Sequence, residues 1–159
     1  MYLDTSIIVK LLVDEPDTEF FQRAVHGELL SSSELAATEI WSALLAKERK
    51  KSISARDRAA AWRVFNERVQ AKQIVLHPLN GIVLKKANQV LERCHPGVPL
   101  RTLDAIHTAA CDLSQDFPLC TNDNRMRDAA LMLGIPVFPE ADPSDLTANL
   151  SLSPDVQSK

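Results

Sequence analysis

The sequence predicts an α/β fold in which a central parallel sheet lies between two layers of helices. Two observations carry this prediction. Short apolar segments suited to buried strands alternate along the chain with longer segments of helical periodicity. The chain has 159 residues, of which 45% are hydrophobic and 25% charged, as expected for one globular domain that buries a sizeable core.

The first half of the chain is expected to contain three strands and four helices. The apolar segments 2–3, 29–31 and 74–76 are typical of short buried strands. One helix is expected to follow the oxygen-rich segment Asp4-Thr5-Ser6, which can cap it, and a second to run from Pro16 to Gly27. Two long helices are expected over 34–49, which contains no Gly or Pro, and over 54–71.

The second half continues the alternation as far as Pro139. Helices are expected over 79–94, 103–113 and 125–133, the last ended by Gly134, and strands over 119–121 and 137–138. Residues 95–99 are interpreted as a loop because they combine two prolines with a glycine. After Pro139 the composition shifts to Asp, Ser, Pro and Asn. We therefore expect a folded domain over residues 1–140 and a poorly ordered tail over residues 141–159.

Several classes of protein are excluded by what the sequence lacks. The three cysteines have no CxxC spacing, which argues against a disulfide framework and against a cysteine zinc site. The four glycines are too widely spaced for a phosphate-binding loop or a dinucleotide-binding turn. The N-terminus lacks the charge order of a signal peptide, and no apolar run approaches the roughly 20 residues that span a bilayer. We expect a cytoplasmic protein without membrane contacts.

Four acidic residues stand where apolar or small residues would be expected. Asp4 and Asp123 each follow a predicted strand, and Glu39 lies in an otherwise apolar part of the 34–49 helix. Asp104 lies one helical turn after Arg101. Each acid has a purely structural alternative. The two strand-end acids can cap helices, Asp104 can pair with Arg101, and Glu39 can be a solvated charge.

Taken together, the four carboxylates predict a cation site. Ligands of a parallel sheet bind beyond the carboxyl ends of its strands, where two strand ends and two helix faces can converge. Four carboxylates in one cleft repel one another and raise one another's pKa unless a divalent cation neutralises them. Because the pattern offers no cysteine or histidine ligand, the hard oxygen donors favour Mg²⁺ or Mn²⁺. Such ions activate water and stabilise an in-line phosphoryl transition state.

The motifs around these acids occur in an order that resembles the PIN domain family. They are MYLDTSIIVKLLVDEP, SELAATEIWSALL, VPLRTLDAIHTAA, CTNDNRMRDAA and GIPVF, and the resemblance runs from Met1 to about Pro139. No single motif is specific, but the four that contain the acids, in this order and with plausible strands and helices between them, make a strong match; GIPVF contains none of the four acids. The pattern is most similar to the VapC-like toxins of bacterial type II toxin–antitoxin pairs.

The resemblance implies a Mg²⁺- or Mn²⁺-dependent endoribonuclease that acts as the toxin of a toxin–antitoxin pair. It implies that Asp4, Asp104 and Asp123 are metal ligands, directly or through water. Glu39 would bind the metal through water or orient the attacking water, and nearby hydroxyls would brace the acids, namely those of Thr5 or Ser6 and of Thr121. The family further implies a structured RNA substrate such as transfer or ribosomal RNA, an antitoxin partner and a homodimer. The number of metal ions stays open, since the residues beside Asp123 are asparagines.

The net charge of −3 does not indicate a nucleic-acid binder, although a local basic patch would suffice. Six basic residues and only two acids lie between positions 47 and 58, the bases being Lys47, Arg49, Lys50, Lys51, Arg56 and Arg58. This cluster is either a solvated helix end or a contact for RNA. Arg125 and Arg127 lie close to Asp123 in the sequence and are further candidates for phosphate contacts. Trp41 and Trp62 are expected in the core or at a dimer contact.

Two other functions are kept as alternatives. A non-catalytic PIN-like module that binds RNA or protein would show no Mg²⁺- or Mn²⁺-dependent change in melting temperature. An aspartyl-phosphate hydrolase is disfavoured because it needs a second Asp two residues after Asp4, where this chain has Ser6. For the nuclease, we expect Asp4→Asn and Asp104→Asn each to abolish cleavage and to leave the fold intact or stabilised, because charge repulsion is relieved.

Overall fold

The computed structural model of the chain describes residues 1–140. Within them, five parallel strands form one sheet in the order β3-β2-β1-β4-β5. The strands are β1 (Tyr2–Leu3), β2 (Leu30–Ser33), β3 (Ile74–His77), β4 (Leu119–Cys120) and β5 (Val137–Phe138). The helices are α1 (Thr5–Leu12), α2 (Thr18–Ala24), α3 (Leu35–Arg49), α4 (Ala55–Gln70), α5 (Gly81–Cys94), α6 (Thr102–Ser114) and α7 (Asn124–Met132). The α/β prediction with a central parallel sheet is confirmed.

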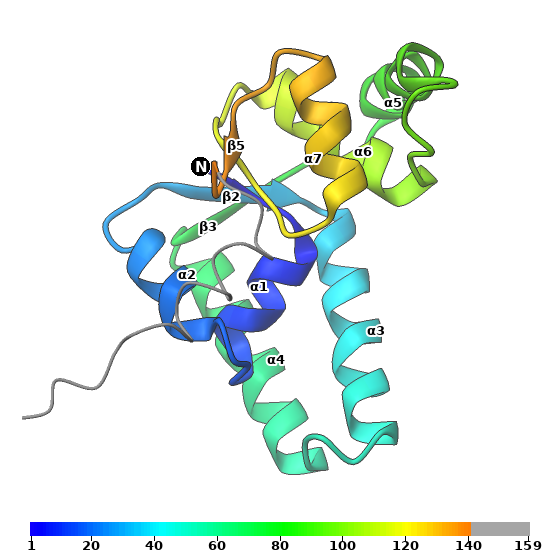
Figure 1. Cartoon of the computed structure of the whole chain (residues 1–159). Helices are drawn as coiled ribbons and strands as arrows, with labels where there is room; N and C mark the ends of the chain where they lie inside the picture. Colours follow the sequence, from blue (N-terminus) through cyan, green and yellow to red (C-terminus); the bar gives the residue numbers. More distant parts are fainter. Residues whose placement is uncertain (141–159) are drawn as a thin grey trace, which may run out of the picture.

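The sheet separates two apolar clusters. Helices α5, α6 and α7 cover one face, and α1 to α4 lie on the other (Figure 1). Successive side chains of a strand point to opposite faces, so Tyr2 packs in the cluster of α5 to α7 and Leu3 in the cluster of α1 to α4. Both side chains are fully buried. The two-residue strand β1 therefore anchors both halves of the core.

The strand order reverses beside β1, and this reversal positions the site. Strands β2 and β3 follow on one side of β1, while β4 and β5 follow on the other. Leu3 is in register with Cys120, and the Asp4 N–H donates to the Cys120 carbonyl at 3.0 Å. The residues that follow β1 and β4 therefore leave the sheet at the same edge, which is where open parallel sheets bind ligands.

Helices α3 and α4 form an antiparallel hairpin that projects from the body of the molecule (Figure 1). The rings of Trp41 and Trp62 lie 5.0 Å apart between the two helices, and the Trp62 ring lies 5.5 Å from that of Phe65. These tryptophans therefore pack within the hairpin, in line with the expectation of a packing role. No helix within residues 1–140 is both long enough and apolar enough to span a membrane.

Strand β2 extends two residues beyond its predicted end at Ser31, because the hydroxyls of Ser32 and Ser33 find backbone partners. The Ser32 hydroxyl donates to the Leu3 carbonyl at 2.7 Å, and the Ser33 hydroxyl accepts from the Leu35 N–H at 3.2 Å. Satisfied hydroxyls are compatible with a buried strand. The predicted tail, residues 141–159, lies outside the described residues.

Candidate active site

A cleft of about 710 Å³ opens at the carboxyl edge of the sheet. Its walls come from the end of β1, from α1, α3 and α6, and from the segment that follows β4. Four acids singled out in the sequence line this one cleft: Asp4, Glu39, Asp104 and Asp123. Residues up to 119 positions apart in the sequence thus share a single cavity whose acidic lining is unusual for a protein interior.

Asp4 is almost completely buried and is held by three hydrogen bonds. As the N-cap of α1 it accepts the Ser6 N–H at 2.6 Å and the Ser6 hydroxyl at 3.0 Å. On its other side it accepts the Thr121 hydroxyl at 2.5 Å. Asp4 therefore caps α1, as the structural alternative predicted, and its carboxylate also faces the cleft, as the functional interpretation predicted.

Thr121 joins Asp4 to Asp123. Its hydroxyl oxygen donates to Asp4 and accepts the Asp123 N–H at 3.1 Å. Asp123 is the N-cap of α7 and accepts the N–H groups of Arg125 and Met126 at 2.9 and 3.1 Å. Partial burial alone would raise the pKa of Asp123, but the Arg125 guanidinium and these N–H donors outweigh it and lower the pKa. Asp123 is therefore ionised over the physiological range.

Asp104 lacks the hydrogen bonds that fix Asp4 and Asp123, and its pKa is raised. It lies in the first turn of α6, and its buried Oδ2 has no hydrogen-bond partner among the described residues. Burial raises its pKa, and the charges of Asp123 and Asp4 raise it further, against the opposing charges of Arg125 and Arg101. No ion pair joins Asp104 to Arg101 in the described part of the chain, so the pairing alternative does not account for this acid.

Glu39 is fixed by two donors that bond the same oxygen. Its Oε2 accepts the Thr5 hydroxyl at 2.6 Å and lies 2.7 Å from His107 Nε2. Since an ionised carboxylate only accepts, Nε2 carries the proton of that bond. Burial alone would raise the pKa of Glu39, but the hydrogen bonds from His107 and Thr5 lower it. Glu39 is therefore not a freely solvated charge.

His107 was missed as a functional residue by reasoning from the sequence. The imidazole is only 2% exposed, and its Nδ1 lies 2.9 Å from the Tyr2 hydroxyl in the core. Burial raises the pKa of Tyr2 well above its usual value, so the phenol keeps its proton and is available to donate. A chain from Tyr2 through His107 thus connects the sheet core to Glu39. The only signal in the sequence was that His107 stands one helical turn after Asp104.

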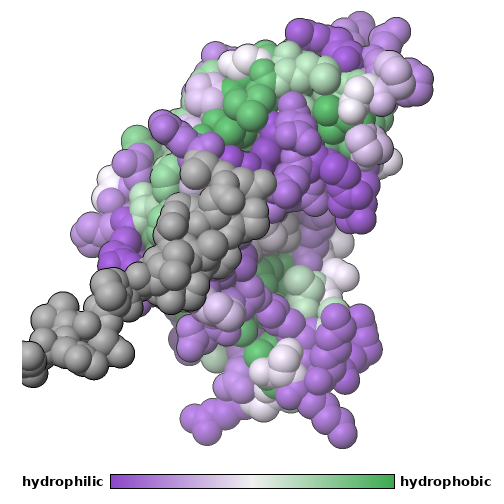
Figure 2. Space-filling model, viewed as in Figure 1, coloured by the Kyte–Doolittle hydropathy of each residue, from purple (hydrophilic) through white to green (hydrophobic). Residues whose placement is uncertain are grey.

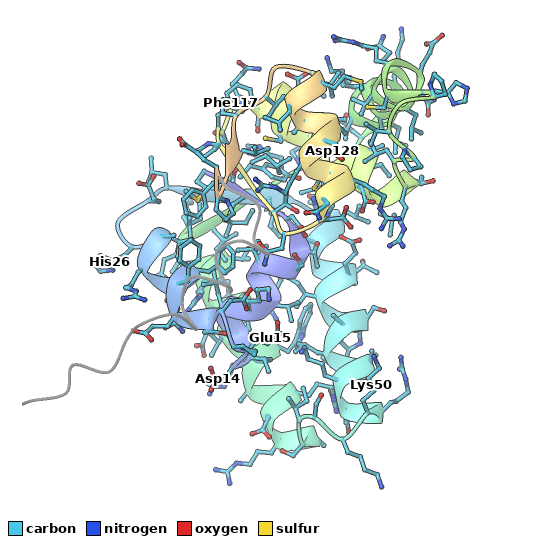
Figure 3. The ribbon with its side chains drawn as sticks, viewed as in Figure 1. Asp14, Glu15, His26, Lys50, Phe117 and Asp128 are labelled. Atoms are coloured by element: carbon cyan, nitrogen blue, oxygen red, sulfur yellow. The ribbon has the colours of Figure 1, made fainter. Side chains whose placement is uncertain are left out.

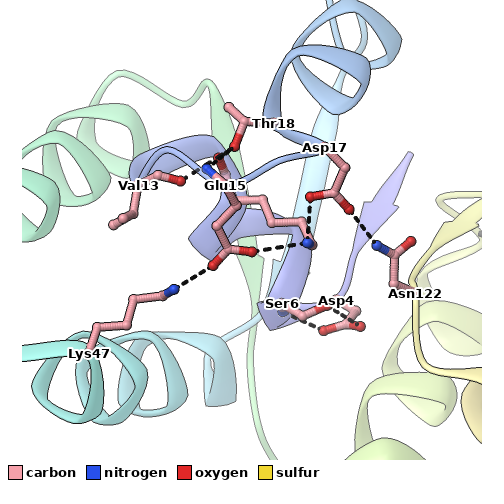
Figure 4. A network of polar contacts seen from close by, with 9 residues as sticks. Asp4, Ser6, Val13, Glu15, Asp17, Thr18, Lys47 and Asn122 are labelled. Atoms are coloured by element: carbon pink, nitrogen blue, oxygen red, sulfur yellow. Dashed lines mark hydrogen bonds and ion pairs between the residues drawn. The ribbon is translucent and has the colours of Figure 1, made fainter. Parts of the chain in front are cut away.

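A network of alternating charges forms another part of the cleft wall (Figure 4). Lys10 donates to Glu15 at 3.0 Å and to Asp17 at 2.7 Å, and Lys47 of α3 pairs with the same Glu15. Asp17 also accepts the side-chain amide of Asn122 at 3.1 Å. Burial alone would lower the pKa of Lys10, but the two carboxylates raise it, so a permanent ammonium lies beside the acids. The network ties α1, α3 and the segment after β4 together.

The two arginines after Asp123 have different surroundings. Arg125 is partly exposed and lies 3.3 Å from the Asp123 carboxylate. Arg127 is buried and donates to the carbonyls of Thr121 and Glu140 at 3.4 and 3.2 Å. The suggested phosphate contact therefore does not fit Arg127, whose side chain holds backbone in the core. Arg125 is partly accessible beside Asp123, which lines the cleft.

The donor chemistry fits a hard divalent cation. Three carboxylates lie close enough that the charges of Asp4 and Asp123 raise the pKa of Asp104, and one oxygen of Asp104 is buried without a partner. Such an oxygen is costly unless something binds it. Among residues 1–140, no three side chains of His, Cys, Asp or Glu stand close enough together to form a ready-made ligand set. The cleft thus suits a hard cation in the type of its donor atoms and in their negative charge.

Comparison with known proteins shows the family of this chain. The family model described as the PIN domain matches residues 1–131. The chain belongs to the PIN domain family. It is 38% identical over 143 residues to Ribonuclease VapC46 of Mycobacterium tuberculosis (strain ATCC 25618 / H37Rv), covering 87% of this chain and 95% of that protein. This PIN domain is thus VapC-like, as the motifs indicated.

A solved structure shares the same PIN fold. The structure titled "Crystal Structure of FitAcB from Neisseria gonorrhoeae" superposes with a TM-score of 0.59 at 16% identity, covering 86% of this chain and 95% of the matched one. At that identity the likeness concerns the fold alone. It agrees with the parallel sheet and the helix layers described above.

Proposed function

We propose that this PIN domain is a divalent-cation-dependent endoribonuclease and the toxin of a toxin–antitoxin pair. The observation that carries the proposal is the buried, unpartnered Oδ2 of Asp104 in a cleft that also holds Asp4, Glu39 and Asp123. A carboxylate in that state opposes folding, which favours a functional reason for its presence. The resemblance to Ribonuclease VapC46 supports RNA as the substrate class.

Each acid has a proposed role that follows from its surroundings. Asp4, Asp104 and Asp123 would hold the cation, either directly or through water. When bound, a Mg²⁺ or Mn²⁺ ion lowers the pKa of water and neutralises charge that develops on the phosphate. Asp4 and Asp123 are fixed in advance by caps and hydroxyls, so they present oxygens at constant positions. Asp104 supplies the oxygen that has no other partner.

Glu39 is proposed to orient the attacking water. Thr5 and His107 both bond its Oε2, so the other oxygen, Oε1, has no hydrogen bond to the described residues. Because these donors lower the pKa of Glu39, the carboxylate is ionised and can accept a proton of the water. His107 and Thr5 act as positioning residues, since fixed orientation of an accepting group is itself a source of rate.

The experiment is RNA cleavage by the purified full chain, with Mg²⁺ or Mn²⁺ and then with a chelator. We expect cleavage only with the cation, and a loss of at least about 100-fold in Asp104→Asn, as when one transition-state-stabilising group is removed. Asp128→Asn is the matched control, because Asp128 is exposed on α7 and lies outside the cleft (Figure 3). Cleavage that survives chelation, or full activity of Asp104→Asn, would contradict the proposal.

The proposed partners are an antitoxin protein and a second copy of the chain. Both rest on the VapC-like resemblance and not on a contact within this chain. Light scattering tests the homodimer against the chain mass of 17.6 kDa. The alternative of a non-catalytic binding module is favoured if the protein binds RNA but fails to cleave it under every cation condition.

A further inference from the structure

We propose that the tip of the α3–α4 hairpin, residues 47–58, is a docking site for the phosphate backbone of the RNA outside the scissile bond. The inference rests on the proposed function, because it places a second contact for the same substrate. Six basic side chains occur in this segment. The structure divides them into two groups that the sequence alone does not separate.

Two of the six cations are engaged with the protein itself. Lys47 pairs with Glu15 in the wall of the cleft. Arg58 pairs with Glu48, and its guanidinium lies 5.0 Å from the centre of the Trp41 ring. Ion pairing and a stacked aromatic ring commit these two side chains to the packing of the hairpin.

The other four cations face solvent at the end of the hairpin. They are Arg49, Lys50, Lys51 and Arg56, all exposed and without an ion pair among the described residues. Asp57, next to Arg56, is engaged in the capping box of α4, where its carboxylate accepts the Ser54 N–H and hydroxyl at 3.0 and 2.7 Å. Hydrophilic side chains gather over this end of the molecule in Figure 2, and Figure 3 locates Lys50 there.

The tip is held in one conformation. At the end of α3, the N–H groups of Lys51 and Ser52 bond the carbonyls of Glu48 and Lys47 at 2.9 and 3.0 Å. Lys51 takes a left-handed conformation with φ of 58°, and three residues later the capping box begins α4. A folded turn fixes the backbone that carries the four cations, so less backbone freedom is lost when a ligand binds.

The distance between the tip and the cleft favours an RNA strand as the ligand of the tip. Helix α3 carries Glu39, Ser42 and Ala46 in the cleft lining and then runs straight to the tip. At 1.5 Å per residue, Lys50 lies about 16 Å along the helix from Glu39. A stacked strand advances about 3.4 Å per nucleotide, so this distance corresponds to about five nucleotides, and to fewer in an extended strand. One RNA strand can therefore occupy both places.

An acidic protein is the competing ligand for a basic surface. Protein interfaces are built around buried aromatic or large apolar anchors. Among the described residues, the large exposed apolar side chains lie elsewhere, at Leu29, Val75, Leu79, Ile82 and further along the chain. The tip offers charge without an anchor, which matches the recognition of phosphates that carry no sequence information.

The test measures affinity for single-stranded oligouridylate as a function of salt, in the full chain carrying Asp104→Asn so that the probe stays intact. The tip variant combines Arg49→Gln, Lys50→Gln, Lys51→Gln and Arg56→Gln. Each phosphate contact contributes about 0.7 to the slope of log K against log salt. Loss of two to four contacts should lower the slope by about 1.4 to 2.8 and weaken binding at 0.1 M salt by about 25-fold or more.

A second variant removes the same charge elsewhere and serves as the matched control. It combines Arg23→Gln, Lys72→Gln, Lys85→Gln and Arg93→Gln, four exposed cations on α2, on α5 and after α4. We expect less than about threefold weakening from this change, which alters the net charge equally. Equal losses in both variants, or no loss in the tip variant, would overturn the proposal.

Two further outcomes are distinguishable. If the tip variant loses affinity for polyglutamate but keeps its affinity for oligouridylate, the surface binds an acidic protein and the RNA proposal is wrong. If the chain without Asp104→Asn fails to cleave any RNA, the proposed function fails, and this binding assay still decides whether the tip holds a phosphate backbone. If cleavage is normal and the tip variant binds like the unaltered chain, only the docking inference fails.

Discussion

Asp4 and Asp104 line the same cleft, yet the fold treats them in opposite ways. Three donors surround Asp4, which caps α1 and receives the Thr121 hydroxyl from the neighbouring strand end. Asp104 has one buried oxygen without a partner, and its pKa is raised. The hydrogen bonds of Asp4 thus stabilise the fold, whereas the buried, unpartnered oxygen of Asp104 on α6 destabilises it. The hydrogen bonds of the fold thus account for the position of Asp4, whereas one oxygen of Asp104 has no such partner among the described residues.

The largest effect that tests this contrast is expected for Asp4→Ala. Loss of the cap costs about 1 kcal/mol. The buried Thr121 hydroxyl, left without its acceptor, adds about 1–3 kcal/mol, giving a total of about 2–4 kcal/mol in the free energy of unfolding measured with urea. The expectation that Asp4→Asn leaves the fold intact or stabilised stays a prediction, because asparagine keeps an acceptor oxygen that alanine lacks. A change below about 0.5 kcal/mol would mean that the Asp4 bonds do not hold the sheet edge.

The next effect concerns the chain of hydrogen bonds behind Glu39. We expect His107→Asn to lower kcat for RNA by about 10- to 100-fold with little change in KM, as is usual when the partner that orients a site residue is lost. Tyr2→Phe removes only the remote hydroxyl of that chain and should lower kcat by less. A rise in KM at constant kcat in His107→Asn would instead indicate a role in substrate binding.

The sequence was sufficient to predict the layers, the strand positions and the four acids in the cleft. Local patterns carry that information, since apolar segments mark strands and an acid in an apolar helix stands out. His107 could not be found in this way, because its partners Tyr2 and Glu39 lie 105 and 68 positions away and an apolar helix face accommodates a buried histidine equally well. Thr121 was predicted to brace an acid, but its link to Asp4 spans 117 positions.

The network around Lys10 could not be predicted from the sequence either, because it depends on contacts between distant residues. Lys10, Glu15 and Asp17 are near neighbours in the sequence and suggest an ordinary surface, yet Lys47 and Asn122 join them across the fold. Likewise, the six cations of residues 47–58 look equivalent in the sequence. Only the folded hairpin shows which of them have internal partners. In the Lys10 network and among these cations, the partners of each side chain depend on contacts made in the folded chain and not on local sequence propensity.

The smallest effect tests the sign of the pKa shift at Asp104. A carboxyl whose pKa is raised in the folded state binds its proton more tightly there than in the unfolded chain. Its contribution to stability is therefore greatest below the unfolded pKa and falls as the pH rises through the folded pKa. We expect Asp104→Asn to be stabilised relative to the unaltered chain by about 0.5–1 kcal/mol at neutral pH, after allowance for solvent screening.

The control for this prediction is the stability of Asp104→Asn relative to the unaltered chain at acid pH. The stability difference between Asp104→Asn and the unaltered chain should shrink as the pH falls through the raised folded pKa. It should be smallest below about 4, where the carboxyl is protonated in both states. Asp123→Asn should show the opposite dependence, because the pKa of Asp123 is lowered and the stability it contributes is lost on acidification. Urea unfolding across this pH range measures both, and parallel curves for the two variants would contradict the assignment.

We propose that the cleft acids bind a hard divalent cation through Asp104. The most direct measurement is the melting temperature of the full chain titrated with Mn²⁺, compared with that of Asp104→Asn. At ten times the dissociation constant, binding adds about 1.4 kcal/mol, so the unaltered chain should melt about 3–6 °C higher, while Asp104→Asn should not respond at the same concentration. An equal rise in both proteins, or no rise in either, would contradict the account.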